Sequence, residues 1–162
     1  MHKFASFTIL IFILGKSESA NVSLSRHGVQ VKPEIGIKGV VTTVRCGGVG
    51  TPLQLRIDGC EGYCQFRAGQ VYECEEDFMP SSAAPSLTLG VEICYRGVCY
   101  VILTAVIPNS SIQPGFRYTA KYSIVPNDVF AGQTIRFFAS IWHTDNGIVE
   151  VCVAADADIL PL

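Results

Sequence analysis

Residues 134–157 read TIRFFASIWH, TDNG and IVEVCVAADA, and this stretch decides the fold. Its first part, 134–143, is rich in β-branched and aromatic side chains, which favour strands, and carries apolar residues on both faces. The pair Asn146-Gly147 that follows is typical of a hairpin, since both residues tolerate the positive φ angles of a tight turn. The last part, 148–157, is again rich in valine. We therefore predict two antiparallel strands joined by a short turn.

The chain keeps this character outward from the hairpin. Short runs of Val, Ile, Thr, Phe and Tyr alternate with Gly, Pro, Asn and Asp, and no helical period is present. Further strands are expected at 53–57, 70–78, within 86–106, and at 116–125. Six or seven strands at this spacing, with no helix among them, predict an all-β sandwich.

Two segments leave alternatives open. The apolar stretch 86–106 is either one long strand or a hairpin that turns at Arg96-Gly97. Residues 20–44 form an N-terminal extension before the main domain at 45–160. One further strand of this extension could come from its apolar residues, which are Val29, Val31, Ile35, Ile37, Val40, Val41 and Val44.

Residues 1–19 have the layout of a cleaved secretory signal peptide. A short basic start precedes the apolar run from Phe4 to Leu14, and small residues stand at Ser17 and Ser19, where signal peptidase selects them. The run is about half the roughly 20 residues that a membrane span needs. We expect cleavage after Ser19, no stable membrane insertion, and a mature domain that is secreted or enters the endosomal and lysosomal lumen. About 143 of the 162 residues then remain, enough for one domain with a real core.

Composition argues against nucleic acid as a partner. The net charge is −2 and no run of Lys or Arg forms a basic face. The secretory route gives weight to two glycosylation acceptors, at Asn21 and Asn109, each followed by serine two residues later.

Seven cysteines in an exported chain indicate a disulfide framework with one thiol left over. A metal site is the rival interpretation, but the mature histidines, His27 and His143, stand in no ligand spacing. We therefore expect neither a metal nor a cofactor.

The pairing of three cysteines depends on the segment 86–106. A turn at Arg96-Gly97 would pair Cys94 with Cys99 and leave Cys74 as a buried thiol. A straight strand would place Cys94 and Cys99 on opposite faces, too far apart for a bridge, and would make Cys74 a candidate partner. We prefer the first pairing.

The residues of catalysis are mostly missing from the sequence. Ser140, His143 and Asp145 are close along the chain, but Ser140 and His143 would point to opposite faces of a strand. No nucleophile elbow surrounds the serine. We therefore expect a protein that is not an enzyme.

The apolar content is large for a chain of this size. It fills an ordinary sandwich core in the simpler interpretation, and lines a cavity between two separated sheets in the other. The residues in question lie in the strand 134–143 and around it, and include Tyr95, Tyr100, Ile102, Phe130, Val149, Val151 and Val153.

Three stretches carry a resemblance to a known family. They are Cys46-Gly47-Gly48, the run from Leu55 through Cys60 and Cys64 to Tyr72, and the last element from Trp142 to Cys152. In this order they resemble the ML-domain lipid-recognition family, which includes the soluble Niemann–Pick type C sterol carriers and the mite group-two allergens. The resemblance covers about residues 45–159. The family's middle cysteine pair lies in a loop that corresponds to 107–115 here, and this loop has no cysteine.

The resemblance implies an immunoglobulin-like β-sandwich of two antiparallel sheets that enclose an apolar cavity. It implies the bridges Cys46–Cys152 and Cys60–Cys64. It also implies a lipid-binding set, in which Phe138 and Trp142 occupy inward positions of their strand. The full set is Phe78, Tyr100, Ile102, Phe130, Phe138, Trp142 and Val153.

The function that follows is that of a lipid carrier. The ligand would be a sterol, a fatty acid or a similar small hydrophobic molecule, and the role would be sterol transport, chemical communication or lipid-based immune recognition. The alternative is a secreted immunoglobulin-like recognition module with a solid core, which binds a protein partner through its loops.

Overall fold

The computed structural model describes residues 22–26 and 38–162. The expected signal peptide, the acceptor Asn21, and the residues Val29, Val31, Ile35 and Ile37 lie outside the described residues. The described strands are β1 (Ser23–Arg26), β2 (Lys38–Val41), β3 (Val44–Gly47), β4 (Thr51–Asp58), β5 (Cys64–Phe66), β6 (Tyr72–Met79), β7 (Leu87–Tyr95), β8 (Val98–Ile107), β9 (Tyr118–Ile124), β10 (Thr134–His143) and β11 (Val149–Ile159), with the 3-10 turn η1 (Asp128–Phe130) before β10.

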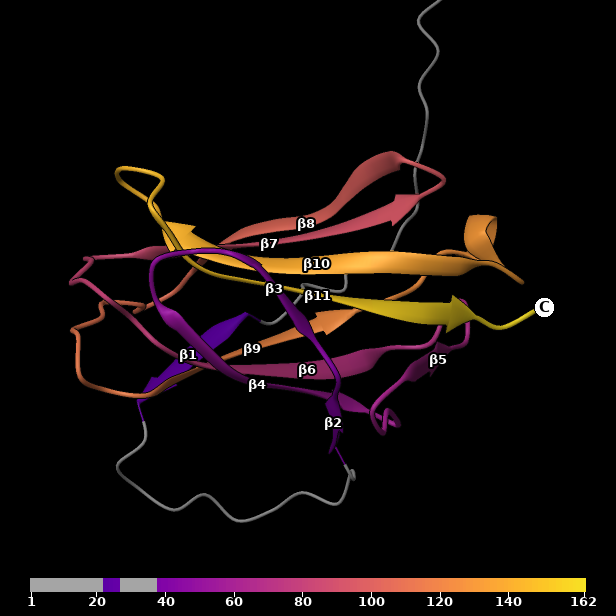
Figure 1. The fold of residues 1–162 in the computed structure, drawn as a ribbon, viewed down its shortest axis with the longest axis horizontal. Helices are drawn as coiled ribbons and strands as arrows, with labels where there is room; N and C mark the ends of the chain where they lie inside the picture. Colours follow the sequence, from indigo (N-terminus) through magenta and orange to yellow (C-terminus); the bar gives the residue numbers. More distant parts are fainter. Residues whose placement is uncertain (1–21, 27–37) are drawn as a thin grey trace, which may run out of the picture.

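The strands form two stacked sheets. The five-stranded sheet has the order β1-β9-β6-β4-β2, and the six-stranded sheet has the order β3-β11-β10-β7-β8, with β5 added beside β11. Figure 1 shows β7, β8 and β10 in the upper layer and β4, β6 and β9 in the lower one. All pairings between named strands are antiparallel except that of β5 with β11. The predicted all-β sandwich is thus the observed architecture.

The predicted hairpin of residues 134–157 is formed by β10 and β11, at the centre of the six-stranded sheet. β10 pairs with β11 from Thr134↔Asp158 onward, and with β7 on its other edge. The turn contains Gly147 at φ 74°, which a glycine adopts without steric cost. From Arg136 to Trp142, β10 has a neighbouring strand on each side, so it sits in the middle of the layer.

The segment 86–106 is a hairpin, so the straight-strand alternative is wrong. Arg96 and Gly97 have φ angles of 50° and 83°, the positive values of a two-residue hairpin turn. Cys94 lies directly opposite Cys99 in the pairing of β7 with β8. The two sulfurs form a disulfide, and Cys74 is a free, buried thiol.

The other two disulfides join Cys46 to Cys152 and Cys60 to Cys64. The first links the neighbouring strands β3 and β11, and its two cysteines are 106 residues apart in the sequence. The second closes the short loop between β4 and β5.

The N-terminal extension adds two strands within the described residues, where the sequence suggested one. β1 pairs with β9 and β2 pairs with β4, so both extend the five-stranded sheet at its two edges. Both strands have only four residues, which is too short for a clear alternation in the sequence.

The core lies between the sheets. On β6, the residues Tyr72, Cys74, Glu76 and Phe78 share the inner face and are buried. The acidic residues of the opposite face form ion pairs on the outside of the five-stranded sheet, with Arg56, Arg117, Lys38 and Lys121 as partners of Glu75 and Asp77.

Candidate functional site

The two sheets separate at one end of the sandwich and leave a cavity of about 510 Å³. This volume falls within the range of roughly 300–1,000 Å³ that is usual for small-molecule sites. The chain crosses from the five-stranded to the six-stranded sheet here, through the segment between β9 and β10. The cavity is lined by Phe66, Val91, Ile93, Tyr95, Tyr100, Ile102, Ile124, Val125, Pro126, Asn127, Val129, Phe130, Ile135, Phe137 and Ile159.

Among the described residues that line the cavity, none carries a charged side chain, and the polar side-chain groups are the Asn127 amide and two tyrosine hydroxyls. The Tyr95 hydroxyl is already engaged, because it donates a hydrogen bond of 2.6 Å to Gln133 Oε1. A wall of this kind favours aliphatic or ring carbons over charged groups, since a buried charge without a partner is costly.

The floor is made by strand alternation. Val91 and Ile93 on β7 and Ile135 and Phe137 on β10 are each two residues apart, so they point to the same side of the six-stranded sheet. The strands are in register, with Phe137 opposite Ile93. All four residues are buried, which gives the cavity a continuous apolar floor.

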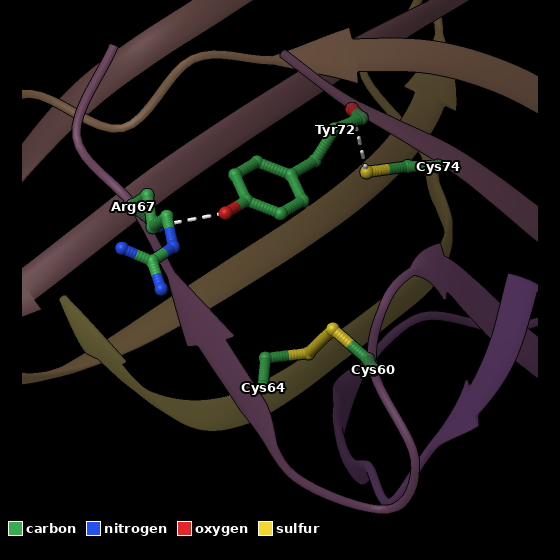
Figure 2. Close-up of a disulfide and its surroundings, with 5 residues drawn as sticks. All are labelled: Cys60, Cys64, Arg67, Tyr72 and Cys74. Atoms are coloured by element: carbon green, nitrogen blue, oxygen red, sulfur yellow. Dashed lines mark hydrogen bonds between the residues drawn. A yellow bond between two sulfur atoms is a disulfide. The ribbon is translucent and has the colours of Figure 1, made fainter. Parts of the chain in front are cut away.

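Phe66 on β5 forms another part of the cavity wall. Its ring meets the ring of Tyr72 edge-on at 4.7 Å between centroids, and the ring of Phe137 at 6.3 Å. Figure 2 shows the Cys60–Cys64 bridge at the start of this strand, and the hydroxyl of Tyr72 accepting a hydrogen bond of 2.7 Å from the Arg67 backbone. The bridge and this bond hold the short strand, and therefore Phe66, in place.

Figure 2 also places the thiol of Cys74 away from that bridge. It lies 3.7 Å from the Tyr72 carbonyl oxygen. Burial raises the pKa of Cys74 far above that of a free thiol, so the thiol is protonated and inert toward exchange.

Aromatic rings surround the mouth of the cavity. Phe130 lies 6.0 Å from the ring of Tyr95 and 5.9 Å from that of Tyr100. Both tyrosines flank the hairpin turn that the Cys94–Cys99 bridge closes. This bridge therefore fixes one side of the mouth, and Phe130 on η1 supplies the other.

The rim is unusually exposed for apolar residues. Ile102, Val125 and Val129 have 44%, 51% and 77% of their surface in contact with solvent, although all three also line the cavity. These three side chains carry no polar group, so a ligand that enters over them meets carbon atoms.

Of the seven lipid-binding residues expected from the sequence, the structure brings three together at this cavity. They are Tyr100, Ile102 and Phe130. Phe78 is buried elsewhere on the inner face of β6, against Tyr118 at 6.1 Å. Val153 is also buried but lines a different, smaller cavity.

The expectation that Phe138 and Trp142 point inward is wrong. The inward residues of β10 are Ile135, Phe137, Ala139 and Ile141, which are all buried, so the alternate residues face the outside of the sheet. The ring of Trp142 lies over Gly90 of the neighbouring strand, where a methyl group would come within 2.6 Å of it. The absence of a side chain at Gly90 makes room for this ring.

The predicted lipid-binding set contains none of the four floor residues, and it also lacks the wall residue Phe66. One signal was present, since residues 135, 137, 139 and 141 are apolar without exception whereas Ser140 interrupts the other face of β10. An unbroken apolar row is the better indicator of the inner face.

A buried polar cluster lies near the β10–β11 turn, away from the cavity. Glu150 Oε1 accepts hydrogen bonds from Ser82 Oγ at 2.8 Å and faces His143 Nε2 at 2.7 Å. Burial raises the pKa of Glu150, but the hydrogen bonds from Ser81, Ser82 and His143 outweigh it and lower the pKa overall.

The serine and the carboxylate of this cluster both face the same histidine nitrogen, with Ser82 Oγ 3.5 Å from it. A catalytic triad uses the two ring nitrogens separately, one for the acid and one for the nucleophile. The cluster instead joins the loop after β6 to the β10–β11 hairpin.

Within residues 22–26 and 38–162, no three His, Cys, Asp or Glu side chains gather into a metal site. No helix there is long and apolar enough to cross a membrane.

Among solved structures, a Niemann–Pick type C2 protein from the Japanese carpenter ant shares the fold. The two superpose with a TM-score of 0.60 at 14% sequence identity, over 72% of this chain and 97% of that one. Identity this low shows a common fold and nothing of the ligand. The predicted immunoglobulin-like β-sandwich of two antiparallel sheets is confirmed.

A CARDB domain from Pyrococcus furiosus also matches, with a TM-score of 0.41 and 18% identity over 68% of this chain and 90% of that one. A score this low supports no inference. No protein-family model and no curated protein matches the sequence.

Proposed function

We propose that this chain is a secreted lipid carrier of the ML type, which holds a sterol, a fatty acid or a similar hydrophobic molecule in the 510 Å³ cavity. The observation that carries the proposal is the lining itself, which combines this volume with the absence of any charged side chain. The fold shared with the Niemann–Pick type C2 protein supports it. The carrier takes up and delivers its ligand without covalent chemistry.

The energetics are sufficient for useful binding. Burying the equivalent of ten methylenes yields roughly 8 kcal/mol at about 0.8 kcal/mol each. This corresponds to a dissociation constant near 1 μM before the cost of ordering the ligand is subtracted. A polar headgroup stays at the mouth, where Asn127 and the Tyr100 hydroxyl are within the lining.

Export is part of the proposal. The layout of residues 1–19 is that of a signal peptide, and three disulfides suit an oxidising compartment. Delivery to the extracellular space or to the endosomal lumen would expose the carrier to donor and acceptor membranes.

Titration with a fluorescent fatty acid tests the proposal. Ile102→Asp places a carboxylate on the rim, and we expect the affinity to fall at least tenfold because the charge must be desolvated when the ligand is bound. Val101→Asp is the matched control: Val101 is the adjacent residue of β8, is 64% exposed and does not line the cavity. Its affinity should stay within about twofold of the wild type.

Equal losses in the two variants would contradict the assignment of the cavity. Absence of binding in the wild type, together with a protein partner captured through the loops, would favour the recognition module instead.

A further inference from the structure

The edge strand β8 lacks the usual protection against pairing with a further strand. It ends the six-stranded sheet (Figure 1), and within residues 22–26 and 38–162 no strand pairs with its outer edge. In this part of the chain, the backbone of residues 98–106 forms no hydrogen bond to a segment other than β7. The outward N–H and C=O groups of β8 are therefore available to another strand.

The other three edges of the two sheets differ from β8. β1, β2 and β3 have four residues each, and each contains one basic residue, which is Arg26, Lys38 or Arg45. Short length and charged side chains are the means by which sheet proteins prevent edge-to-edge pairing. β8 has ten residues, VCYVILTAVI, with neither a charged side chain nor a proline. Its length and composition thus favour pairing.

The side chains of β8 add apolar surface to this open edge. Tyr100 and Ile102 lie on the side of the lipid cavity, and Val101 and Val106 lie on the opposite side of the sheet. All four side chains are exposed. A strand that pairs with β8 would therefore cover apolar groups on both faces of the sheet, in addition to completing the backbone hydrogen bonds.

An irregularity in β8 determines which residues share a face. In the pairing with β7, Ile102 is an additional residue, because Val101 faces Glu92 and Leu103 faces Val91. Side chains alternate before and after this point. The inner face therefore carries residues 98, 100, 102, 103, 105 and 107, and the outer face carries residues 99, 101, 104 and 106.

This arrangement makes β8 complementary to a second copy of itself. A two-fold axis at the middle of the strand places Val101 opposite Thr104, and Tyr100 opposite Ala105, of the second copy. Each of these pairs lies on one face of the joined sheet, whereas a regular strand of ten residues would place inner residues opposite outer ones. No like charges meet across the axis, because the strand carries none.

We propose that the protein forms a weak dimer in solution, in which the β8 strands of two copies pair antiparallel and join their six-stranded sheets into one continuous sheet. The contact uses the same surface on both copies, so it closes at the dimer. A contact through a single strand is small, so the dimer is expected to depend on concentration. The proposal does not depend on the lipid cavity.

Sedimentation velocity of the full mature chain tests the proposal, at concentrations from about 5 to about 500 μM that cover weak dimers. The wild type should shift from the monomer toward the dimer over this range. Val101→Lys places a charge on the outer face of the paired edge and should weaken the dimer about tenfold or more. Val40→Lys is the matched control, because Val40 is an exposed valine of another edge strand, β2. Its dimerisation should match the wild type to within about twofold.

The double variant Val101→Lys/Thr104→Glu tests the register. The new ammonium group of each copy then faces the new carboxylate of the other, so dimerisation should recover to within about threefold of the wild type. Amide hydrogen exchange locates the contact without any substitution, because exchange within β8 should slow as the wild-type concentration rises. Circular dichroism verifies that each variant is folded.

A wild type that remains monomeric at the highest concentration would overturn the proposal. Exchange within β8 that does not change while the protein dimerises, or a Val101→Lys dimer as tight as that of the wild type, would place the contact elsewhere and overturn it too. A double variant that dimerises no better than Val101→Lys would contradict the pairing about the middle of the strand. Each of these results leaves the lipid-carrier proposal standing.

Discussion

Glu75, Glu76 and Asp77 are consecutive acidic residues of β6 in opposite environments. Burial raises the pKa of Glu75 and of Asp77, but ion pairs and hydrogen bonds outweigh this effect and lower each pKa to about 2. The partners of Glu75 are Lys38 and Arg56. The partners of Asp77 are Arg56, Thr119 and Arg117. Glu76 points the other way, into the apolar layer, and its pKa is raised to about 8. The alternation of the strand thus separates a charged outer face from a neutral inner carboxyl.

This contrast predicts the pH dependence of stability. The unfolded chain ionises Glu76 near pH 4.5, whereas the folded chain keeps the proton up to about pH 8. The stability linked to that proton is therefore complete below pH 4.5 and is lost as pH rises toward 8, with a slope of at most about 1.4 kcal/mol per pH unit. Denaturant unfolding between pH 5 and 8 should show that the free energy of unfolding of Glu76→Gln increases relative to that of the wild type as pH rises.

Parallel stability curves for the two proteins would contradict this prediction. The ion pairs of Glu75 and Asp77 affect stability in a different pH range. Because the pKa of each of these carboxyls is lowered, the stability that they contribute is lost only as pH falls from about 4.5 toward 2. Their effect should be the same in both proteins.

The position of Trp142 predicts how its fluorescence responds to a ligand. Its ring lies outside the sandwich over Gly90, so binding of a non-fluorescent fatty acid in the cavity should leave its emission maximum unchanged. Gly90→Ala serves as the positive control, because the added methyl group would overlap the ring and move it. A marked blue shift on ligand binding would mean that Trp142 reaches the ligand, against the observed side of β10.

Among the elements, the long strands were predictable and the short ones were not. The strands around 53–57, 70–78 and 134–143 are long enough for composition and alternation to reveal them. β2 and β5 have four and three residues, and their place is set by pairing with β4 and β11 rather than by local sequence. Tertiary pairing cannot be obtained from such short segments.

The site was less predictable than the fold, for a related reason. On β10 both faces carry large apolar side chains, so only the unbroken apolar row at 135, 137, 139 and 141 indicates which face is inside. Tyr100 and Ile102 were predicted from the resemblance to the ML-domain family and not from the pattern of their own strand. Val129 belongs to a crossing segment whose position depends on how the sheets separate.

The disulfides join elements over different spans, and this predicts unequal contributions to stability. In the chain-entropy model the Cys46–Cys152 bridge, with its separation of 106 residues, contributes about 4–5 kcal/mol, and the Cys94–Cys99 bridge, with a separation of five, about 2 kcal/mol. Chemical denaturation of the two double Cys→Ala variants should show this order. A larger loss from Cys94→Ala/Cys99→Ala would contradict it.

The loop after β8 carries the remaining acceptor for a glycan. Asn109 is exposed at φ 52°, while Ser110 is buried and bonded to the Ile107 carbonyl oxygen at 2.6 Å. In a secreting eukaryotic cell we expect Asn109→Gln and Ser111→Ala each to lose one glycan by mass spectrometry. Ser110→Ala leaves the acceptor sequence intact and should keep it; loss of the glycan in that variant as well would argue against this acceptor.

For the whole molecule, the central feature is that the two sheets enclose a cavity of about 510 Å³ at one end of the sandwich. Large buried rings such as Phe78 and Tyr122 fill the layer away from that end. At the open end the crossing segment and the β7–β8 hairpin enclose space instead of filling it. A solid sandwich would have needed side chains from the rim to fold inward, but Val129 remains 77% exposed.

The most direct test is mass spectrometry of an organic extract of the protein purified from the medium of eukaryotic cells. If the cavity holds a lipid, the extract of the wild type contains a sterol or fatty acid in near-stoichiometric amount, and the extract of Ile102→Asp contains much less. An extract of correctly folded wild-type protein with no lipid, after expression in lipid-supplemented medium, would contradict the account.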